Sequence, residues 1–401
     1  MQSRIDRARA PAMQSVVTIE KLVFGGTGLA RTADGVMLVA DALGGERVRI
    51  EPTGKRGGVV TARTVELLTP SPDRRAPPCP VAGVCGGCDW QHIVYKTQLS
   101  AKAAIFDDCM RRIGRIRELP GVEIFSADEF GYRHRVQIKI DTRGKAGFFA
   151  KRTNEVVPID RCPLLVDPLN RLLAALPGRL PTPPLPMPNL MAIAGDGGEV
   201  ASFPRIDGLT VESVTISAGT ARFRVAGNSF FQSNKPLLEP LGNWARPHAG
   251  GDRFIDLYGG TGFFSVMLAD RFAEGLLVES VGAQVEAARK NFVLNSIHNV
   301  KAEEGTAERL SSFAGVKPVS CLVVDPPRPG LTRTVRESIA TLKPAMALYV
   351  SCNPSTQARD VGFLVHKAGY EIARAAIFDL YPNTHHMESV MMLTRKKNNK
   401  A

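Results

Sequence analysis

Long apolar runs and acidic residues are scarce in this chain of 401 residues, and both shortages narrow what it can be. No uninterrupted apolar stretch approaches the roughly 20 residues that cross a bilayer, so we expect no membrane partner. The N-terminus, MQSRIDRARAPAMQSVV, is basic but lacks an apolar core segment, which excludes a secretory signal. We expect a cytoplasmic protein with a frayed N-terminal tail, in which Met13 could be an alternative start.

Negative charge is in short supply as well, because 39 Asp and Glu residues stand against 51 Lys and Arg residues. The formal net charge of +12 favours a polyanionic partner, since each phosphate that a cation neutralises releases counterions. Charge alone does not separate a nucleic-acid-binding protein from a merely basic one. The seven cysteines, an odd number, argue against a disulfide framework.

The pattern of apolar residues predicts an α/β protein with three regions. Residues 14–70 alternate apolar and polar positions between glycine turns, which predicts four or five short strands in a small OB-like β-barrel. Residues 71–227 mix helical and strand patterns, and a proline-rich segment, LPGRLPTPPLPMPNL, reads as a loop. Residues 228–401 alternate apolar strand-like runs with helical patterns, as in a doubly wound, Rossmann-like parallel sheet.

Three cysteines crowd into the segment CPVAGVCGGC, with the spacing C-x5-C-x2-C. They are Cys79, Cys85 and Cys88, and Cys162 is a fourth candidate ligand from a distant segment. Four thiolates suit either Zn²⁺ or an iron–sulfur cluster. A zinc ribbon normally shows two short C-x2-C pairs, so three local ligands and one remote ligand lean toward [4Fe–4S]. The spacing is not the C-x3-C-x2-C of radical enzymes.

The remaining cysteines differ from one another in their surroundings. Cys109 lies in a helical pattern and Cys321 in an apolar strand, so we expect both in the core. Cys352, in LYVSCNPSTQARD, stands where a buried strand must stop. Its place at the carboxyl end of a strand indicates the active crevice of a doubly wound sheet.

The segment FIDLYGGTGFFS predicts a ligand-binding turn between a strand and a helix. Its glycines let the backbone approach a ligand, but the dinucleotide pattern G-x-G-x-x-G is absent. The next strand ends in LLVES, which places Glu279 where a ribose hydroxyl pair could be held. This combination fits S-adenosylmethionine better than NAD, although a simple tight turn is an alternative explanation of the glycines.

Two carboxylates complete the predicted chemistry beside Cys352. Asp325, in VVDPPRPGL, ends an apolar strand and could hold a substrate amide. A thiolate that adds to C6 of uracil makes C5 nucleophilic, and C5 can then take the methyl group of a sulfonium. The C5 proton must leave to a base, and Glu388 at the start of an apolar strand is the candidate. For the adjacent His385 and His386 we expect structural or substrate-contact roles rather than a metal site.

A cationic strand pattern in GYRHRVQIKIDTRGKAGFFAKR predicts contacts with phosphates, although a solvated strand face would look the same. The cations concerned are Arg133, Arg135, Lys139, Arg143 and Lys145.

The motifs CPVAGVCGGC, FFQSN, DLYGGTG, DPPRPGL, YVSCNPSTQARD and HMESV together resemble the bacterial RNA (uracil-5-)methyltransferases, in particular the branch that modifies 23S rRNA. The resemblance covers nearly the whole chain and implies a TRAM barrel, a central [4Fe–4S] region and a methyltransferase domain. By this resemblance Cys352 is the nucleophile and Glu388 the proton acceptor. It also implies the cluster ligands Cys79, Cys85, Cys88 and Cys162, and the cofactor-binding residues Gln232, Tyr258, Glu279 and Asp325, with Thr306 as a weaker candidate.

The chain departs from the family pattern at Phe263, where many members carry a polar Asn in the cofactor loop. We expect methyl transfer from S-adenosylmethionine to C5 of a uridine in 23S rRNA, by a monomer. The alternatives are a tRNA uridine-C5 methyltransferase and an inactive iron–sulfur RNA-binding protein. A cytosine-C5 enzyme fits less well, since Arg328 stands where such enzymes carry a Cys after D-P-P.

Overall fold

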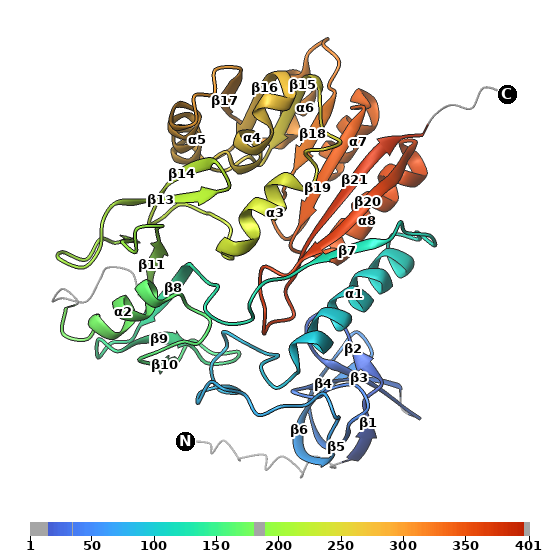
Figure 1. Ribbon diagram of the computed structural model, residues 1–401. Coiled ribbons are helices and arrows are strands. Elements are labelled where there is room, and N and C mark those ends of the chain that lie inside the picture. The colour runs from blue at the N-terminus through green and yellow to red at the C-terminus, as the bar shows by residue number, and fades with distance from the viewer. Residues whose placement is uncertain (1–14, 34, 180–188, 397–401) are drawn as a thin grey trace, which may run out of the picture.

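The computed structural model describes residues 15–33, 35–179 and 189–396, which form four sheets with helices packed on the largest one (Figure 1). The predicted N-terminal tail and most of the predicted proline-rich loop lie outside these residues. The four apolar runs predicted as strands in the C-terminal region are strands, although the sheet also contains an antiparallel strand that we did not expect, and Cys109 and Cys321 are buried in the core as expected.

The N-terminal region folds into one six-stranded sheet with the order β1-β5-β6-β4-β3-β2. Its strands are β1 (Ser15–Thr18), β2 (Lys21–Leu22), β3 (Gly28–Thr32), β4 (Gly35–Ala40), β5 (Arg47–Arg56) and β6 (Val59–Thr69). The described residues thus hold six strands where we expected four or five, because β2 is only a two-residue piece. Alternate apolar side chains such as Val17, Val39 and Val48 form a small core of their own. A barrel of the TRAM type remains a prediction.

The central region contributes a five-stranded antiparallel sheet, β10-β9-β8-β11-β12, and a separate hairpin, β13-β14. Its elements are α1 (Tyr95–Arg112), β7 (Val122–Phe125), β8 (Arg135–Ile140), β9 (Ala146–Phe149), β10 (Val156–Pro158), α2 (Asp167–Ala175), β11 (Asn189–Ala194), β12 (Val200–Phe203), β13 (Ser213–Ala218) and β14 (Ala221–Ala226). Helix α2 packs on the five-stranded sheet through Leu169, Leu172 and Leu173. The cysteine-rich segment has no long helix or strand and lies between this sheet and the N-terminal one (Figure 1).

The largest sheet has eight strands in the order β17-β16-β15-β18-β19-β21-β20-β7. Its strands are β15 (Gly251–Leu257), β16 (Phe272–Glu279), β17 (Val300–Glu304), β18 (Cys321–Val324), β19 (Met346–Ser351), β20 (Tyr370–Phe378) and β21 (Glu388–Arg395), with β7 from the central region. Its helices are α3 (Leu238–Asn243), α4 (Phe263–Leu268), α5 (Gly282–Leu294), α6 (Leu310–Ala314), α7 (Arg333–Leu342) and α8 (Pro354–Lys367), with short 3₁₀ turns η1 (Lys235–Leu237), η2 (Ala269–Arg271) and η3 (Ala307–Arg309).

Strands β15 to β19 are parallel, and the order of the sheet reverses direction between β15 and β18. Their side chains alternate between two hydrophobic cores, one on each face, as Phe254 and Ile255 illustrate. A doubly wound sheet binds ligands outside the carboxyl ends of the strands, at the point where the order reverses. The fold therefore directs attention to one edge of this sheet.

The central region is built into the large sheet, because β7 pairs in parallel with β20 and α1 runs beside α8 (Figure 1). Helix α1 also carries Lys102, whose ammonium donates to Asp379 Oδ1 (2.6 Å) just after β20. Both side chains are fully buried, and Tyr95 donates to the second carboxylate oxygen (3.0 Å). This ion pair fixes the end of β20 from outside the C-terminal region.

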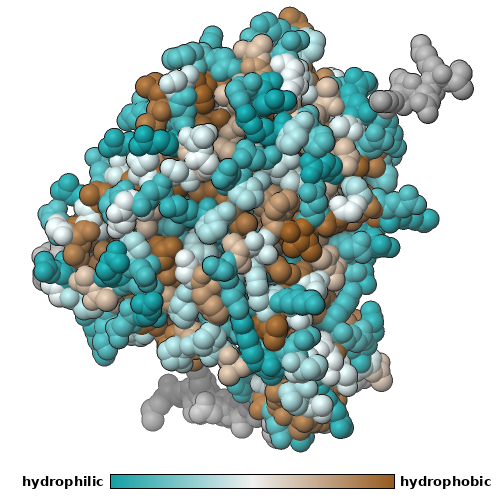
Figure 2. Space-filling model, viewed as in Figure 1, coloured by the Kyte–Doolittle hydropathy of each residue, from teal (hydrophilic) through white to brown (hydrophobic). Residues whose placement is uncertain are grey.

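Among the described residues, no helix has the length and apolar character needed to cross a bilayer. On the face shown in Figure 2, apolar side chains are scattered among hydrophilic ones rather than gathered in one broad patch.

The buried pair predicts a clear stability effect. Lys102→Met keeps the packing but leaves the Asp379 carboxylate buried without its cation, so we expect a loss of about 3–5 kcal/mol in the free energy of unfolding. Urea unfolding measures it. The double variant Lys102→Met, Asp379→Asn should recover much of the loss, since no charge is then buried.

The matched control is Lys317→Met, which breaks the exposed ion pair with Glu274 and should cost less than about 1 kcal/mol. If Lys102→Met destabilises the protein no more than Lys317→Met does, the buried pair does not fix the end of β20.

Candidate active site

Adjacent strand ends bring five of the predicted site residues into one row. From one side to the other, the carboxyl ends of β16, β15, β18 and β19, and the amino end of the antiparallel β21, carry Glu279, Tyr258, Asp325, Cys352 and Glu388. All five line a single cavity of about 730 Å³. The row runs through the point at which the strand order reverses, where a ligand is expected.

Cys352 stands in the turn between β19 and α8. Strand β19 ends at Ser351, and α8 begins at Pro354, which has no N–H to leave unpaired. The Asn353 side chain caps the helix by accepting from the backbone N–H groups of Ser355 (3.0 Å) and Thr356 (3.4 Å). The cap stops the strand at this point and leaves the Cys352 thiol at the mouth of the cavity, next to the positive end of the helix dipole.

The register of β21 against β19 sets Glu388 opposite Cys352. The two strands are antiparallel, and Ser351 is paired with Ser389. Cys352 follows the one and Glu388 precedes the other, so the thiol and the carboxyl project from neighbouring positions. The Ser389 hydroxyl lies within hydrogen-bond distance of Ser351 O (3.1 Å) and of Gln357 Oε1 in α8 (2.7 Å), and a bond to either one stabilises this register.

Glu388 is only 2% exposed, and its Oε1 has no hydrogen-bond partner within the part of the chain that the structure describes. Burial raises the pKa of the Glu388 carboxyl well above its ordinary value, and the charge of Asp325 adds to the effect. Burial also raises the pKa of Asp325, to about 7. The pair therefore has one group that can hold a proton near neutral pH.

Burial and the neighbouring carboxyl groups also change the pKa of the Cys352 thiol. Burial raises the pKa of Cys352 to about 11, and the charges of Glu388 and Asp325 add to it, whereas Arg328 lowers it. At neutral pH the free protein thus keeps Cys352 protonated. A positive charge brought into the cavity would favour the thiolate.

The loop that follows β18 is clamped onto α8 by one buried carboxylate. Asp360, fully buried, accepts from the Leu331 N–H (2.8 Å), from the Tyr349 hydroxyl (2.7 Å) and from Arg359 Nε (2.8 Å). The proline-rich DPPRPGL segment is therefore held firmly, and Asp325 with it. This explains how an irregular loop can position a carboxylate at the cavity.

The other end of the cavity is lined with polar groups suited to a nucleoside. Glu279 accepts from the Gly260 N–H (3.1 Å) and from the Val281 N–H (2.9 Å), which orients its carboxylate at the end of β16. Gln232 is 5% exposed, and no partner for its Oε1 exists among the described residues. His134 Nε2 bonds to the Gln232 carbonyl (2.6 Å) and fixes that residue.

At two positions of the turn, the structure explains why the residue is glycine. Gly262 has φ = +89°, which only glycine adopts readily, and it caps α4. A Cβ on Gly259 would lie 2.4 Å from the Leu277 side chain, so the turn packs directly on β16. Gly260 of the same turn lines the cavity.

One predicted site residue, Thr306, and the departing position Phe263 do not line the cavity. Thr306 is exposed and belongs to the connection after β17, one strand beyond β16, and it is not among the cavity-lining residues. Phe263 is 7% exposed and packs against Phe223 and Phe231, with ring centroids 5.5 and 5.9 Å away. The chain therefore has an aromatic core contact where many family members carry a polar side chain.

Several lining residues escaped the sequence analysis. They include Phe230, Ser280, Gln284, Tyr381 and Thr384. Gln284 lies in the first turn of α5, directly after Glu279, and that placement could have indicated it. Tyr381 comes from the connection between β20 and β21, and nothing in its local sequence marks it as a site residue. Burial raises its pKa, and the charges of Glu388 and Cys352 add to the rise, which indicates that the three lie close together.

The two adjacent histidines have separate surroundings. His386 lines the cavity, and burial lowers the pKa of its imidazole to about 4, so it is neutral at pH 7. His385 faces away and pairs with Asp89, which also accepts from the His385 backbone N–H (3.0 Å). Of the five cations predicted to contact phosphate, Arg133 lines the cavity, and Arg135 lies over the Phe230 ring (5.4 Å) at its rim.

The four candidate cluster cysteines line a second, small cavity together with apolar side chains. Gln91 Nε2 donates to Cys88 Sγ (3.2 Å), and burial raises the pKa of Cys88 to about 12. Across the described residues, no three His, Cys, Asp or Glu side chains converge on a position for one metal ion.

Several known proteins resemble this chain over most of its length. Residues 207–396 match the family described as tRNA (Uracil-5-)-methyltransferase. An RNA methyltransferase of Aquifex aeolicus is 32% identical over 95% of this chain and 98% of its own. The 23S rRNA (uracil(1939)-C(5))-methyltransferase RlmD of Pseudomonas aeruginosa is 32% identical over 96% of both chains.

A crystal structure of the Pyrococcus abyssi tRNA (uracil-54, C5)-methyltransferase in complex with S-adenosyl-L-homocysteine shares the fold. Its TM-score is 0.74 at 24% identity, with 95% of this chain and all of that chain covered.

The doubly wound sheet, with its row of strand-end residues around one cavity, defines a methyltransferase of the Rossmann-like class. The relatives that match over nearly the full length identify the family within this class. The chain belongs to the RNA (uracil-5-)methyltransferase family.

The buried carboxyl Asp256 in β15 predicts a pH effect on stability. Its side chain is 1% exposed, and burial raises its pKa to about 7, with the charge of Asp325 adding to the rise and a bond from Ser265 (2.7 Å) opposing it. In the unfolded chain the pKa is about 3.9. The native state therefore holds this proton more tightly, and the stabilisation present below about pH 4 is lost as the pH rises through 7.

Asp256→Asn cannot ionise, so its urea midpoint should fall less between pH 5 and pH 8 than that of the wild type. Asp207→Asn, at an exposed surface position, is the matched control and should leave the pH dependence unchanged. An identical pH dependence in the wild type and Asp256→Asn would contradict this account.

Proposed function

We propose that the protein transfers a methyl group from S-adenosylmethionine to C5 of a uridine in 23S rRNA. The observation that carries the proposal is the juxtaposition of Cys352, Glu388 and Asp325 in one cavity, opposite a nucleoside-binding end. A thiol and a carboxyl across two paired strands have no packing reason to be buried together, whereas addition to C6 and proton removal from C5 require both.

The residues at the β15–β16 end fit the methyl donor. Glu279 presents an oriented carboxylate for ribose hydroxyls, and Gln232 and Gln284 each hold a buried Oε1 without a protein partner in the described residues. Unpaired buried acceptors of this kind are costly unless a ligand donates to them. S-Adenosylmethionine supplies an electrophilic methyl group and a positive charge, and the carboxylates of Asp325 and Glu388 favour that charge nearby.

The reaction then follows from the chain's own groups. The Cys352 thiol loses its proton to solvent, its thiolate forms a bond to C6, and the electron pair of the C5–C6 double bond moves toward O4, which makes C5 a nucleophile. C5 takes the methyl group, and its bond to the donor sulfur breaks. Glu388 accepts the C5 proton, the C5–C6 double bond re-forms, and the Cys352–C6 bond breaks to release the thiolate. Asp325 is positioned to hold the uracil N3–H or O4 edge through its carboxyl.

The target uridine must leave its stack to enter a cavity at the strand ends. Arg133 and Arg135 border that cavity, and the aromatic rings of Phe230 and Tyr381 offer stacking surfaces for a base. The net charge of +12 supports binding to phosphates. The cytoplasmic location, the monomeric state and the three domain boundaries stay predictions.

We further propose that Cys79, Cys85, Cys88 and Cys162 hold a [4Fe–4S] cluster and that residues 15–69 form a TRAM-type barrel. The thiol-lined cavity, the donor from Gln91 and the apolar surroundings fit such a cluster. The cluster would crosslink the cysteine-rich segment rigidly to the central sheet. The cysteine-rich segment has no long helix or strand of its own to hold it in place.

A tRNA substrate is the second candidate. The Pyrococcus abyssi structure described above is that of a tRNA methyltransferase and matches 95% of this chain, so the N-terminal and cysteine-rich regions do not by themselves distinguish rRNA from tRNA enzymes. The full-length relatives named for 23S rRNA favour the ribosomal substrate.

Removal of the base tests the reaction. With Glu388→Gln, 23S rRNA fragments and S-adenosylmethionine, proton loss should stop and a denaturant-resistant protein–RNA adduct should accumulate, detected by gel shift and mapped to its nucleotide. The adduct should vanish in the double variant that also carries Cys352→Ala. An adduct with tRNA but not rRNA would favour the second candidate, and no adduct with either would argue for an inactive RNA-binding protein.

Loss of one cluster ligand should remove the cluster. Cys162→Ala, purified anaerobically, is expected to lose most of its iron and sulfide and its visible absorbance, because three thiolates cannot complete the coordination. Cys109→Ala, which changes a core thiol far from the thiol-lined cavity, is the matched control and should keep the wild-type iron content. Equal iron in both variants would contradict the ligand assignment.

A further inference from the structure

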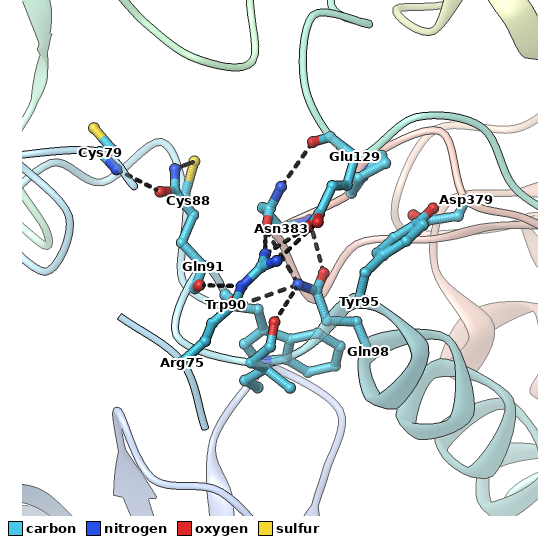
Figure 3. Close-up of polar contacts among 12 residues, drawn as sticks. Arg75, Cys79, Cys88, Trp90, Gln91, Tyr95, Gln98, Glu129, Asp379 and Asn383 are labelled. Carbon is cyan, nitrogen blue, oxygen red and sulfur yellow. Dashed lines mark hydrogen bonds and ion pairs between the residues drawn. The ribbon is translucent and has the colours of Figure 1, made fainter. Parts of the chain in front are cut away.

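The connection between β20 and β21, residues 379–387, contributes Tyr381 and His386 to the cavity and leads directly into Glu388. Most of the bonds that hold this connection come from far away in the sequence. Lys102 binds Asp379 and the Tyr381 carbonyl, and Figure 3 shows further partners from residues 75–129. The connection that leads into the candidate base Glu388 is therefore held by residues 75–129.

Asn383 is the centre of this arrangement and is fully buried. Its Oδ1 accepts from Arg75 Nη2 (2.9 Å) and Gln98 Nε2 (3.1 Å), and its Nδ2 donates to the Glu129 carbonyl (2.7 Å). Its backbone N–H donates to Gln98 Oε1 (2.8 Å), and its carbonyl accepts from the Trp90 N–H (3.0 Å). Its φ of +64° lies in the left-handed region, which asparagine tolerates better than most residues.

The same network continues to the thiols (Figure 3). Arg75 Nε donates to the Gln91 carbonyl (2.9 Å), and the Gln91 amide donates to Cys88 Sγ (3.2 Å) and accepts from the Cys79 N–H (3.3 Å). Through Gln91 and Arg75, the candidate cluster ligands and Asn383 belong to one hydrogen-bonded unit.

A second contact runs parallel to the first. Asp89, the residue after Cys88, binds both the backbone N–H and the ring of His385. The cysteine-rich segment thus holds the connection at Asn383 and again at His385. Cys352, in contrast, is held by β19 and by the Asn353 cap of α8, which have no part in this network.

We propose that Asn383 is a positioning residue for Glu388 and that it ties the placement of this carboxylate to the cysteine-rich segment. The inference rests on the proposed function, in which Glu388 accepts the C5 proton. Because the network holds the connection that leads into Glu388, and not the turn that carries Cys352, its loss should slow proton removal while addition of Cys352 and methyl transfer continue. A base displaced by about 1 Å can lose roughly 100-fold in rate.

The test uses Asn383→Gly, which accepts the left-handed backbone and removes only the side-chain bonds. Two rates are measured in single turnovers with the cluster-containing protein: incorporation of labelled methyl into RNA, and release of tritium from RNA that contains 5-tritiated uridine. We expect tritium release to fall roughly 10- to 100-fold while methyl incorporation stays close to the wild-type rate, so the denaturant-resistant adduct accumulates. Iron content should remain at the wild-type level.

Asn299→Gly is the matched control. This asparagine also bridges two backbone carbonyls through its Nδ2 (2.9 Å each), but it precedes β17 at the amino edge of the sheet, away from the cavity, and both rates should be unchanged. Arg75→Lys, which keeps Asn383 and Gln98, should show the same split to a smaller extent. This second variant keeps the test decisive if Asn383→Gly folds poorly.

Equal losses in methyl incorporation and tritium release, in either variant, would overturn the inference and leave Asn383 with a purely structural role. Wild-type behaviour of both variants would overturn it too. Failure of the proposed function is recognised separately, because Glu388→Gln would then give no adduct at all.

Discussion

The antiparallel pairing of β21 with β19 is the constraint on which the rest of the site depends. A doubly wound parallel sheet by itself brings Glu279, Tyr258, Asp325 and Cys352 to one edge. Only a strand that runs the other way can start at this edge and set Glu388 beside Cys352. The Ser351–Ser389 pair and Gln357 lock the register, and a shift by one residue would turn the carboxylate to the other face.

Electrostatics in the cavity follows from this geometry. Asp325, Glu388 and Cys352 are enclosed together, so burial raises all three pKa values, and neighbouring negative charges add to the rise for Glu388 and Cys352. The free protein therefore keeps protons that catalysis must move, and a cationic ligand would shift the balance toward the thiolate and the carboxylate.

Local patterns were enough to predict most of the fold and part of the site. Apolar runs located β15, β16, β18 and β19, and strand ends indicated Glu279, Asp325 and Cys352. The partner of an antiparallel strand is chosen by tertiary packing, so the pairing of β21 and the insertion of β7 into the sheet left no local signal.

The contacts of the β20–β21 connection were out of reach for the same reason. Arg75 and Asn383 lie 308 positions apart, and each looks like an ordinary loop residue in its own segment. Thr306 was only a weak candidate from the family resemblance. It follows β17, the edge strand beyond β16, and it does not line the cavity. Phe263 lies in the predicted cofactor loop, but its side chain packs in the hydrophobic core.

The most direct test of the central claim uses RNA in which the target uridine is replaced by 5-fluorouridine. Fluorine cannot leave C5 as a proton does, so the wild-type enzyme should stop as a covalent complex after methyl transfer. Mass spectrometry of the digested complex should find a methylated 5-fluorouridine on the peptide that contains Cys352. A complex through another residue, or methylation elsewhere on the RNA with no complex at all, would contradict the account.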